Sequence, residues 1–333
     1  MILPDTRAPL DADTAAHAFA ALLDRRVGED EALRFLRDMA ERDETAVEIA
    51  AAAQAMRARM VPVRAPDGAI DVCGTGGDGS HSLNVSTAVA IVVAAAGVPV
   101  AKHGNRAASS QAGAADTLEA LGLDLDRAST AAEDTLAGLG IAFLFAQKHH
   151  PALAWLAPVR RAIRRRTVFN LTGPACNPAG VRRQLIGVAR PGFLDVFAGA
   201  IEILGTEATL LVAGDEPLDE LSIDGPSTLK WIVGAGGGPA RGGPLERIDP
   251  DAAGLPHHPL AALRGGTAAY NAAALSRLLA GEAGAYRDAV LFNAAAALRV
   301  AGAAADWHAG VAQAAEAIDS GAAGRLLKAW IAA

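Results

Sequence analysis

Short apolar segments of strand length alternate with longer apolar segments of helical spacing from residue 70 onward. This alternation limits the possible folds more than any other feature of the sequence. The predicted strands cover residues 70–73, 98–101, 141–145, 185–189 and 208–213, and the predicted helices between them include 85–96, 112–121 and 194–204. Strands that alternate with helices imply a largely parallel sheet that is covered on both faces. The sequence therefore predicts an α/β fold with a mainly parallel sheet flanked by helices.

The N-terminal part of the chain has a different pattern. Residues 11–60 carry apolar side chains at helical spacing, and residues 61–69 contain two prolines and a glycine, which is typical of a linker. We expect a small N-terminal helical domain over residues 1–65, joined by a helix around 151–165. The large α/β domain is expected to span residues 66–333.

The C-terminal third is predicted to contain a loop followed by helices. The stretch GAGGGPARGGP, residues 234–244, is interpreted as a mobile loop or the tip of a loose hairpin. From residue 268 to the end the chain is rich in alanine and is predicted to be helical. No internal repeat is visible.

Composition and charge exclude several functional classes. Half of the residues are hydrophobic but only 4% are aromatic, so the core must be built mainly from Ala, Val, Leu and Ile. The formal net charge is −7, and the only concentration of basic residues lies at 160–161 and 164–166. A protein that binds nucleic acid or acidic membranes in bulk should be more positive. We therefore expect neither nucleic acid nor a membrane as a partner, and any anionic ligand needs a local site.

The two cysteines and the apolar segments indicate a cytoplasmic protein. Cys73 and Cys176 are isolated and lack CxxC spacing, which argues against a disulfide framework or a structural zinc site. The N-terminal sequence has no basic region followed by an apolar stretch, so no signal peptide is expected. The most apolar run, residues 85–100, is shorter than a membrane span and is interpreted as a buried helix leading into a strand.

The strongest local signal is a glycine-rich segment, GTGGDG at 74–79, between a predicted strand and the NVST sequence at 84–87 that opens a helix. Glycine allows the backbone to approach phosphate oxygens, and a helix N-terminus offers free N–H groups. Ser86 and Thr87 add hydroxyl donors. The segment matches neither GxGxxG nor the Walker A pattern, and a simple tight turn remains the alternative.

Two further polar segments follow predicted strands. KHGNR at 102–106, with Ser109 and Ser110 after it, should face the same crevice as the glycine-rich segment, because ligands bind beyond the carboxyl ends of strands in open α/β sheets. His103 is interpreted as a hydrogen-bonded structural histidine or, as the alternative, a proton-transfer group. Adjacent Asp219 and Glu220 suit Mg²⁺, which prefers oxygen ligands. Exposed acidic pairs such as 215–216 are common, so this pair alone is weak support for a metal.

Seven segments together resemble the anthranilate phosphoribosyltransferase family. They are DVCGTGGDGSHSLNVSTA, KHGNRAASSQAGAADTLEALG, FLFAQKHHPAL, RTVFNLTGPACNPAG, QLIGV, LDELS and RDAVLFNAAAAL, in the family's order and with its approximate spacing. The resemblance covers essentially the whole chain. It implies transfer of a phosphoribosyl group from phosphoribosyl pyrophosphate (PRPP) to the amine of anthranilate in tryptophan biosynthesis. The products are N-(5-phosphoribosyl)anthranilate and pyrophosphate, and the resemblance also implies Mg²⁺ dependence and a homodimer formed through the helical domains.

The resemblance also implies which residues contact each ligand. The residues expected along PRPP are Gly74, Gly77, Asp78, Ser82, Asn84, Val85, Ser86, Thr87, Lys102, His103, Gly104, Asn105, Arg106, Ala107, Ala108, Ser109, Ser110 and Ala114. Those expected to hold Mg²⁺ are Ser86, Asp219 and Glu220, and those expected to contact anthranilate are Gly74, Asn105 and Arg160. His150 matches a family position that lines the acceptor tunnel.

Arg160 makes chemical sense as a partner of the anthranilate carboxylate, because guanidinium binds carboxylate in a bidentate fork. Its alternative is a solvated helix residue among several arginines. The family usually has Lys-Ser at positions 111–112 and Ser at 114, where this chain has Gln-Ala and Ala. The missing hydroxyl at Ala114 corresponds to about 0.5–1.5 kcal/mol. These departures bear on PRPP affinity and leave the expected metal ligands intact.

The expected chemistry is mainly electrostatic. Loss of pyrophosphate from the ribose places negative charge on the leaving group, which Mg²⁺, backbone N–H groups and Lys102, the one candidate catalytic residue, would stabilise. The arylamine is neutral at pH 7, so no essential general base is expected. The alternatives are a pyrimidine-nucleoside phosphorylase of related architecture and a non-catalytic relative that binds nucleic acid. The Asp219–Glu220 pair and the KHGNR segment argue against the first, and the net charge argues against the second.

Overall fold

The computed structural model describes residues 2–107, 110–216, 218–234 and 239–333. One seven-stranded sheet forms its centre, with strand order β3-β2-β1-β4-β5-β6-β7. The strands are β1 Ile70–Gly74, β2 Val100–Gly104, β3 Ile141–Phe145, β4 Arg183–Gly187, β5 Ala208–Gly214, β6 Ser227–Gly234 and β7 Ala240–Ile248. Strands β1 to β5 pair in parallel, and β6 and β7 extend the sheet in antiparallel pairs. The predicted α/β fold with a mainly parallel sheet is confirmed.

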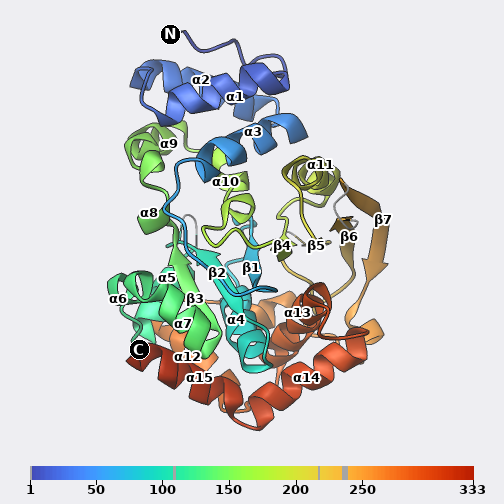
Figure 1. Ribbon diagram of the computed structural model, residues 1–333. Helices are drawn as coiled ribbons and strands as arrows, with labels where there is room; N and C mark the ends of the chain where they lie inside the picture. Colours follow the sequence, from blue (N-terminus) through green and yellow to red (C-terminus); the bar gives the residue numbers. More distant parts are fainter. Residues whose placement is uncertain (1, 108–109, 217, 235–238) are drawn as a thin grey trace.

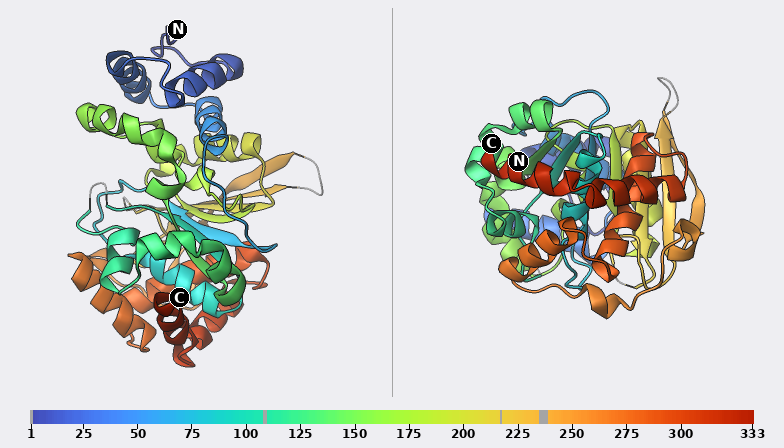
Figure 2. Two further views of the ribbon diagram at one scale, coloured as in Figure 1. Left: turned by 60° about the vertical axis from the view of Figure 1, so that its left-hand side comes forward. Right: turned by 90° about the horizontal axis from the view of Figure 1, so that it is seen from below.

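Helices cover both faces of this sheet (Figures 1 and 2). The α-helices are α1 Ala12–Leu23, α2 Glu29–Glu41, α3 Ala46–Arg57, α4 Val85–Ala95, α5 Ala114–Ala120, α6 Leu125–Thr130, α7 Ala132–Leu139, α8 Ala146–His149, α9 Ala157–Ile163, α10 Val168–Leu171, α11 Leu194–Leu204, α12 Ala268–Leu279, α13 Ala285–Ala301, α14 Trp307–Asp319 and α15 Ala322–Ala332. Short 3₁₀ helices cover Pro151–Leu156, Pro174–Cys176, Pro191–Phe193, Pro250–Ala253 and Leu260–Leu263. Among the residues described, no helix has the length and apolar character needed to cross a membrane.

Alternating side chains of the strands divide the core into two large clusters. In β5, Leu210 and Val212 face the cluster that contains α4 and α13, whereas Leu211 and Ala213 face the cluster that contains α1, α2, α3 and α11. This period of two is what a strand buried on both faces requires. Figure 2 shows the result in its left view, with the N-terminal helices on one side of the sheet and the C-terminal helices on the other.

Two of the N-terminal helices, α1 and α3, begin at polar capping residues. Asp11 accepts a hydrogen bond from the backbone N–H of Thr14 at 2.8 Å and starts α1. Thr45 and Glu48 form a capping box at the start of α3, in which each side chain accepts from the other residue's backbone N–H. Helix α3 packs against α1 and against α11 of the sheet layer, and α9 packs against α2. The division into domains at residues 1–65 and 66–333 stays a prediction.

Several predicted boundaries were wrong by two or more residues. The strand expected at 98–101 is Val100–Gly104, so residues 102–104 form the end of a strand instead of the loop after it. The strand expected at 185–189 is Arg183–Gly187, and the helix expected at 112–121 begins only at Ala114. The helix expected around 151–165 is a 3₁₀ turn followed by α9.

The segment 234–244, interpreted as a mobile loop or the tip of a loose hairpin, joins the antiparallel strands β6 and β7, but most of its described residues belong to those strands. Residues 240–244 belong to β7, the edge strand, and residues 235–238 lie outside the described residues. Its composition of glycine, proline and arginine hid the strand, because these residues are depleted in strands or neutral toward them. In the sheet, pairing with β6 overrides that local preference.

Candidate active site

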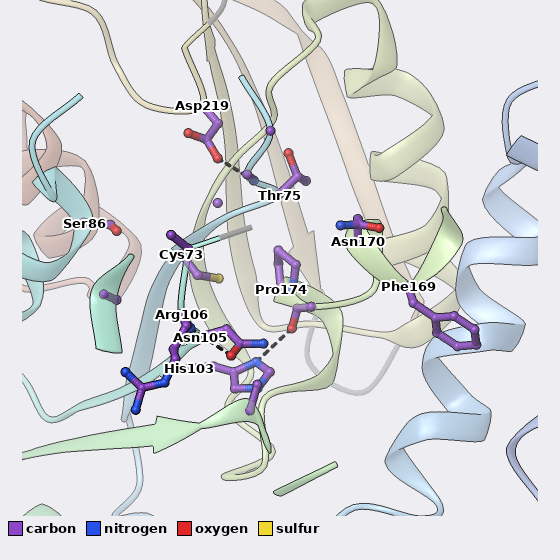
Figure 3. A pocket seen from close by; sticks show the side chains of 18 of the residues that line it. Cys73, Thr75, Ser86, His103, Asn105, Arg106, Phe169, Asn170, Pro174 and Asp219 are labelled. Atoms are coloured by element: carbon purple, nitrogen blue, oxygen red, sulfur yellow. Dashed lines mark hydrogen bonds between the residues drawn. The ribbon is translucent and has the colours of Figure 1, made fainter. Parts of the chain in front are cut away.

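A cavity of about 350 Å³ lies at the carboxyl ends of β1 and β2, between the sheet and α3, α9 and α10 (Figure 3). Fourteen of the residues expected from the sequence line it: Gly74, Gly77, Ser86, Lys102, His103, Gly104, Asn105, Arg106, Ala107, Ser110, Ala114, His150, Arg160 and Asp219. Asp78, Ser82, Asn84, Val85, Thr87 and Glu220 are not among the lining residues. Ala108 and Ser109 lie outside the described residues.

The glycine-rich segment leaves β1 and curves beside the cavity before α4 begins. Gly76, Gly77 and Gly79 have φ of 67°, 77° and 78°, a left-handed conformation that glycine adopts at little cost. Thr75 anchors the segment to β4, because its N–H donates to the carbonyl of Gly187 at 2.9 Å and its Oγ1 accepts from the N–H of Ala189 at 3.1 Å. A Cβ added at Gly77 would meet no protein atom within 4 Å, so this part of the backbone is open to a ligand.

Replacement of Gly77 by Ala should weaken PRPP binding by about tenfold or more, because the new methyl group would block the approach of phosphate oxygens. A left-handed non-glycine residue also costs roughly 1–2 kcal/mol of stability. Gly97→Ala is the matched control, since Gly97 has φ of 94° and equally open space but lies at the far end of α4. The melting temperature should fall by a similar amount in both variants. Calorimetry should detect weaker PRPP binding only for Gly77→Ala. Equal PRPP affinity of the two variants would contradict the ligand role.

Two carboxylates from the segment after β5 converge on the glycine-rich segment and on α4. Asp219 Oδ2 accepts the N–H of Gly76 at 2.7 Å, and Glu220 Oε1 accepts the N–H of Ser86 at 3.0 Å. The second oxygen of Glu220, Oε2, is buried without a hydrogen-bond partner among the described residues. Burial, with the charge of Asp78 added, raises the pKa of Asp219 to about 7. Burial and the Asp219 charge raise the pKa of Glu220 as well.

These carboxylates fit a divalent cation. A buried carboxylate oxygen without a hydrogen-bond partner costs free energy. The raised pKa values of the two neighbouring carboxyls indicate that too little positive charge lies near them. Ser86, whose backbone N–H donates to Glu220, adds a hydroxyl, and oxygen ligands of this kind suit Mg²⁺. The exposed Asp215, which the sequence could not distinguish from this pair, is instead ion-paired with Arg247.

The backbone of Asp219 lies directly against the ends of β1 and β4. A Cβ built at Gly187 would lie 1.4 Å from the carbonyl oxygen of Asp219, and one at Gly74 would lie 2.2 Å from its Oδ2. Neither distance allows a side chain, so these two glycines are required for the carboxylate to occupy its position. Gly187 was not selected from the sequence, although a glycine inside a predicted strand is a usable signal of a close backbone approach.

Lys102 is part of the cavity wall, with only 2% of its surface exposed. Its ammonium donates to the carbonyl of Val72 at 2.7 Å and to Ser86 Oγ at 3.2 Å. Burial lowers its pKa, and the buried carboxylate of Asp71 opposes that shift. Lys102 therefore supplies positive charge beneath the cavity and orients the Ser86 hydroxyl.

His103 and His150 form a buried pair on the cavity wall. His103 Nδ1 donates to the carbonyl of Gly173 at 3.0 Å, a contact drawn in Figure 3. This fixes His103 Nε2 as the acceptor, so His150 Nε2 donates to it over 3.2 Å. Burial lowers the pKa of His103 to about 3 and that of His150 to about 4. Both rings are therefore neutral at neutral pH.

Acidification should destabilise the protein through this pair. Because the folded pKa values lie below the ordinary value of 6.5, the unfolded chain binds more protons at low pH. The contribution of the neutral histidines to the free energy of unfolding is fully present above pH 6.5 and is lost as the pH falls toward 4. In His150→Gln the free energy of unfolding should fall by roughly 3 kcal/mol less between pH 7 and pH 4 than in the wild type. Urea unfolding at the two pH values measures the difference. His17→Gln, on the exposed face of α1, is the control. An unchanged pH dependence in His150→Gln would contradict a neutral, buried His150.

Arg160 brings a positive charge to the opposite end of the cavity. Burial lowers the pKa of its guanidinium, and no carboxylate among the described residues opposes that shift or lies within ion-pair distance of it. It donates a long hydrogen bond from Nη2 to Asn170 Oδ1 at 3.4 Å. Asn170 Oδ1 also accepts the N–H of Thr167 at 3.1 Å, which fixes the orientation of the amide. Figure 3 shows the Asn170 amide nitrogen on the side of the cavity.

Other predicted residues support the site from behind. Asn84 Oδ1 accepts from Thr117 Oγ1 at 2.6 Å and from Asn271 Nδ2 at 2.9 Å, so it ties the start of α4 to α5 and α12. Arg106 is ion-paired with Asp116 and Glu119. Several cavity residues were not selected from the sequence as site residues, among them Met56, Leu153, Phe169, Asn170 and Pro174. These come from α3, α10 and two 3₁₀ helices, and only the fold brings them together.

A cavity with a glycine-rich segment, a carboxylate and a helix N-terminus suits a substrate that carries phosphate groups and a divalent cation, as in transferases that act on phosphorylated sugars. In agreement, a family model described as "Glycosyl transferase family, a/b domain" matches residues 66–324. The anthranilate phosphoribosyltransferase of Novosphingobium aromaticivorans is 59% identical over 334 residues, covering 100% of this chain and 99% of the relative. The chain belongs to the anthranilate phosphoribosyltransferase family.

Solved structures agree with this assignment. The anthranilate phosphoribosyltransferase from Thermus thermophilus has 41% sequence identity and a TM-score of 0.88, covering 98% of this chain and 96% of that one. The enzyme from Saccharomyces cerevisiae in complex with PRPP and Mg has 27% identity and a TM-score of 0.88, covering 97% and 93%. The predicted family, α/β fold and enzyme class are therefore confirmed.

Proposed function

We propose that this chain transfers the phosphoribosyl group of PRPP to the amine of anthranilate, giving N-(5-phosphoribosyl)anthranilate and pyrophosphate for tryptophan biosynthesis. Family membership supports the reaction, and the yeast relative in complex with PRPP and Mg supports the donor and the metal. The observation that carries the acceptor is Arg160, a half-buried guanidinium without a carboxylate partner among the described residues, in the same cavity as Asp219 and the glycine-rich segment.

The glycine-rich segment and the start of α4 are proposed to bind the phosphates of PRPP. Left-handed glycines present backbone N–H groups without side chains, and the helix N-terminus adds its positive dipole end. Ser110 lines the same cavity from the segment after β2. Ala114 also lines it, as a methyl group where the family usually offers a hydroxyl.

Ser86, Asp219 and Glu220 are proposed to hold Mg²⁺, and the buried Glu220 Oε2, which has no partner among the described residues, supports this assignment. A bound Mg²⁺ would neutralise charge on the pyrophosphate group. The protein's own contribution is to keep two carboxylates and one hydroxyl converged beside the phosphate-binding backbone. Lys102 maintains the Ser86 hydroxyl in place from below.

Arg160 and Asn105 are proposed to orient anthranilate at the other end of the cavity. Arg160 would pair with the carboxylate, and Asn170 restrains the guanidinium. Positioning an arylamine that is already neutral is a large part of the task, because bringing two reactants together in the correct geometry lowers the barrier by itself. The neutral His103–His150 pair adds no charge near the amine. No residue is assigned as an essential general base.

We further propose that residues 1–65, together with α9, form a small domain that is hinged to the large domain of residues 66–333. The packing of α9 on α2 supports this division. A homodimer through the helical domains and a cytoplasmic location are part of the same proposal. Size-exclusion chromatography with light scattering measures the oligomeric state directly.

The function is tested by loss of anthranilate fluorescence in the presence of PRPP and Mg²⁺. Turnover should require all three components and should stop in EDTA. Phosphorolysis of uridine or thymidine, with no reaction of anthranilate, would support the phosphorylase alternative instead. Retention on heparin at low salt, with no turnover, would support a non-catalytic protein that binds nucleic acid.

A further inference from the structure

Asn293, in the middle of α13, holds the backbone next to the carboxylate pair. Its Oδ1 accepts the N–H of Leu221 at 2.9 Å, and its Nδ2 donates to the carbonyl of Leu221 at 3.0 Å. The second Nδ2 hydrogen is used by the carbonyl of Ala289, one turn earlier, at 2.9 Å. The Asn293 side chain is almost fully buried, and it binds both backbone groups of the residue that directly follows Glu220.

An asparagine at this position is not explained by packing. Every other buried residue of α13 is apolar, and Asn is a weaker helix former than Ala or Leu. Leu221 lies outside every helix and strand, so no ladder of backbone hydrogen bonds fixes it. The asparagine side chain takes the place of that ladder, because it offers one donor and one acceptor to the same peptide segment.

The clamped segment carries two half-buried carboxylates whose like charges repel each other. The carboxylates of Asp219 and Glu220 accept hydrogen bonds from the backbone N–H groups of Gly76 and Ser86, respectively. Without a cation, neighbouring like charges favour separation. A fixed Leu221 prevents the segment from moving away from the glycine-rich segment and from α4.

We propose that Asn293 is a positioning residue for the metal site. By holding both backbone groups of Leu221, it keeps Glu220 and Asp219 converged before the cation binds. The inference rests on the metal assignment proposed above. Residues that orient metal ligands from behind typically change metal affinity by roughly ten- to a hundredfold when they are replaced.

The test compares Asn293→Leu with a stability-matched variant. Leu has a similar volume and suits the apolar surroundings, but it cannot bind Leu221. Leu298→Ala, at a fully buried position on the same helix, destabilises the core and keeps the Asn293 side chain. Calorimetric titration of Mg²⁺ in the presence of pyrophosphate, without anthranilate, measures metal affinity independently of turnover. We expect about ten- to a hundredfold weaker Mg²⁺ binding in Asn293→Leu and unchanged binding in Leu298→Ala.

A second variant keeps the proposal testable if Asn293→Leu does not fold. Asn293→Ser retains one hydroxyl, which reaches at most one backbone group of Leu221, and should weaken Mg²⁺ binding in the same direction. The KM for anthranilate at saturating Mg²⁺ should change less than about twofold in either Asn293 variant, because the acceptor end of the cavity is untouched. Unchanged Mg²⁺ affinity in both variants, or equal weakening in Leu298→Ala, would overturn the positioning role. Absence of Mg²⁺ dependence in the wild-type protein would instead contradict the metal assignment.

Discussion

Replacement of Asp219 by Asn together with Glu220 by Gln is expected to lower kcat/KM by about three orders of magnitude in Mg²⁺ buffer. Loss of the cation from the pyrophosphate group removes about 4 kcal/mol of transition-state stabilisation, which corresponds to that factor. The amide oxygens can still accept the N–H groups of Gly76 and Ser86, so the backbone contacts are preserved. Steady-state kinetics with varied PRPP and Mg²⁺ measures the effect.

Stability separates this metal effect from misfolding. In the absence of Mg²⁺ the double variant should melt no lower than the wild type at pH 8, because burial raises the pKa values of both carboxyls and their charged forms are unfavourable. Asp215→Asn is the matched control, since this nearby exposed carboxylate pairs with Arg247 at the surface. Full activity of the double variant in Mg²⁺ would contradict the assignment of these residues to the metal.

Arg160→Ala is expected to lower kcat/KM for anthranilate by roughly ten- to two-hundredfold. Truncation leaves the substrate carboxylate without its charged partner in a partly desolvated cavity, and a hydrogen bond to a charged group is worth about 1.5–3 kcal/mol. PRPP binding should stay nearly unchanged, because Arg160 lies on α9, away from the glycine-rich segment. Arg160→Lys should recover only part of the loss, because an ammonium cannot form a bidentate fork.

Aniline distinguishes a binding role of Arg160 from a structural one. This amine lacks the carboxylate, so it should be a poor substrate for the wild type and should lose little more in Arg160→Ala. Arg161→Ala, one residue further along α9 and exposed, is the control and should keep wild-type kinetics with both amines. An equal loss with anthranilate and aniline in Arg160→Ala would show that the residue is structural.

The sequence predicted the parts of this site that local chemistry determines. The glycine-rich segment and the Asp219–Glu220 pair were visible because several polar or glycine residues stand together after a strand. The register of β2 was missed because Lys102 and His103 are polar, yet both are buried at the end of that strand. Their polar groups are satisfied by residues distant in sequence, such as Asp71 and Gly173.

Residues that act over long separations could not be found in this way. Asn293 meets Leu221 across 72 positions, and nothing near either residue indicates the contact. Asn170 was part of a segment that resembled the family, but its contact with Arg160 depends on the turn between α9 and α10. The antiparallel β7 was hidden by its own composition, and only its pairing with β6 makes it a strand.

The two glycines beneath Asp219 have a consequence for how this site can vary. Gly74 and Gly187 are register partners on adjacent strands, so together they form a bare patch of backbone on which the carboxylate segment rests. A wall made of side chains can be rebuilt by compensating changes, as the chain's own Gln111, Ala112 and Ala114 illustrate on the neighbouring segment. A wall made of backbone has no side chain whose rotamer or volume could change to compensate for a substitution. Diversity in donor or acceptor preference must therefore arise elsewhere in the cavity, while the metal end keeps one fixed shape.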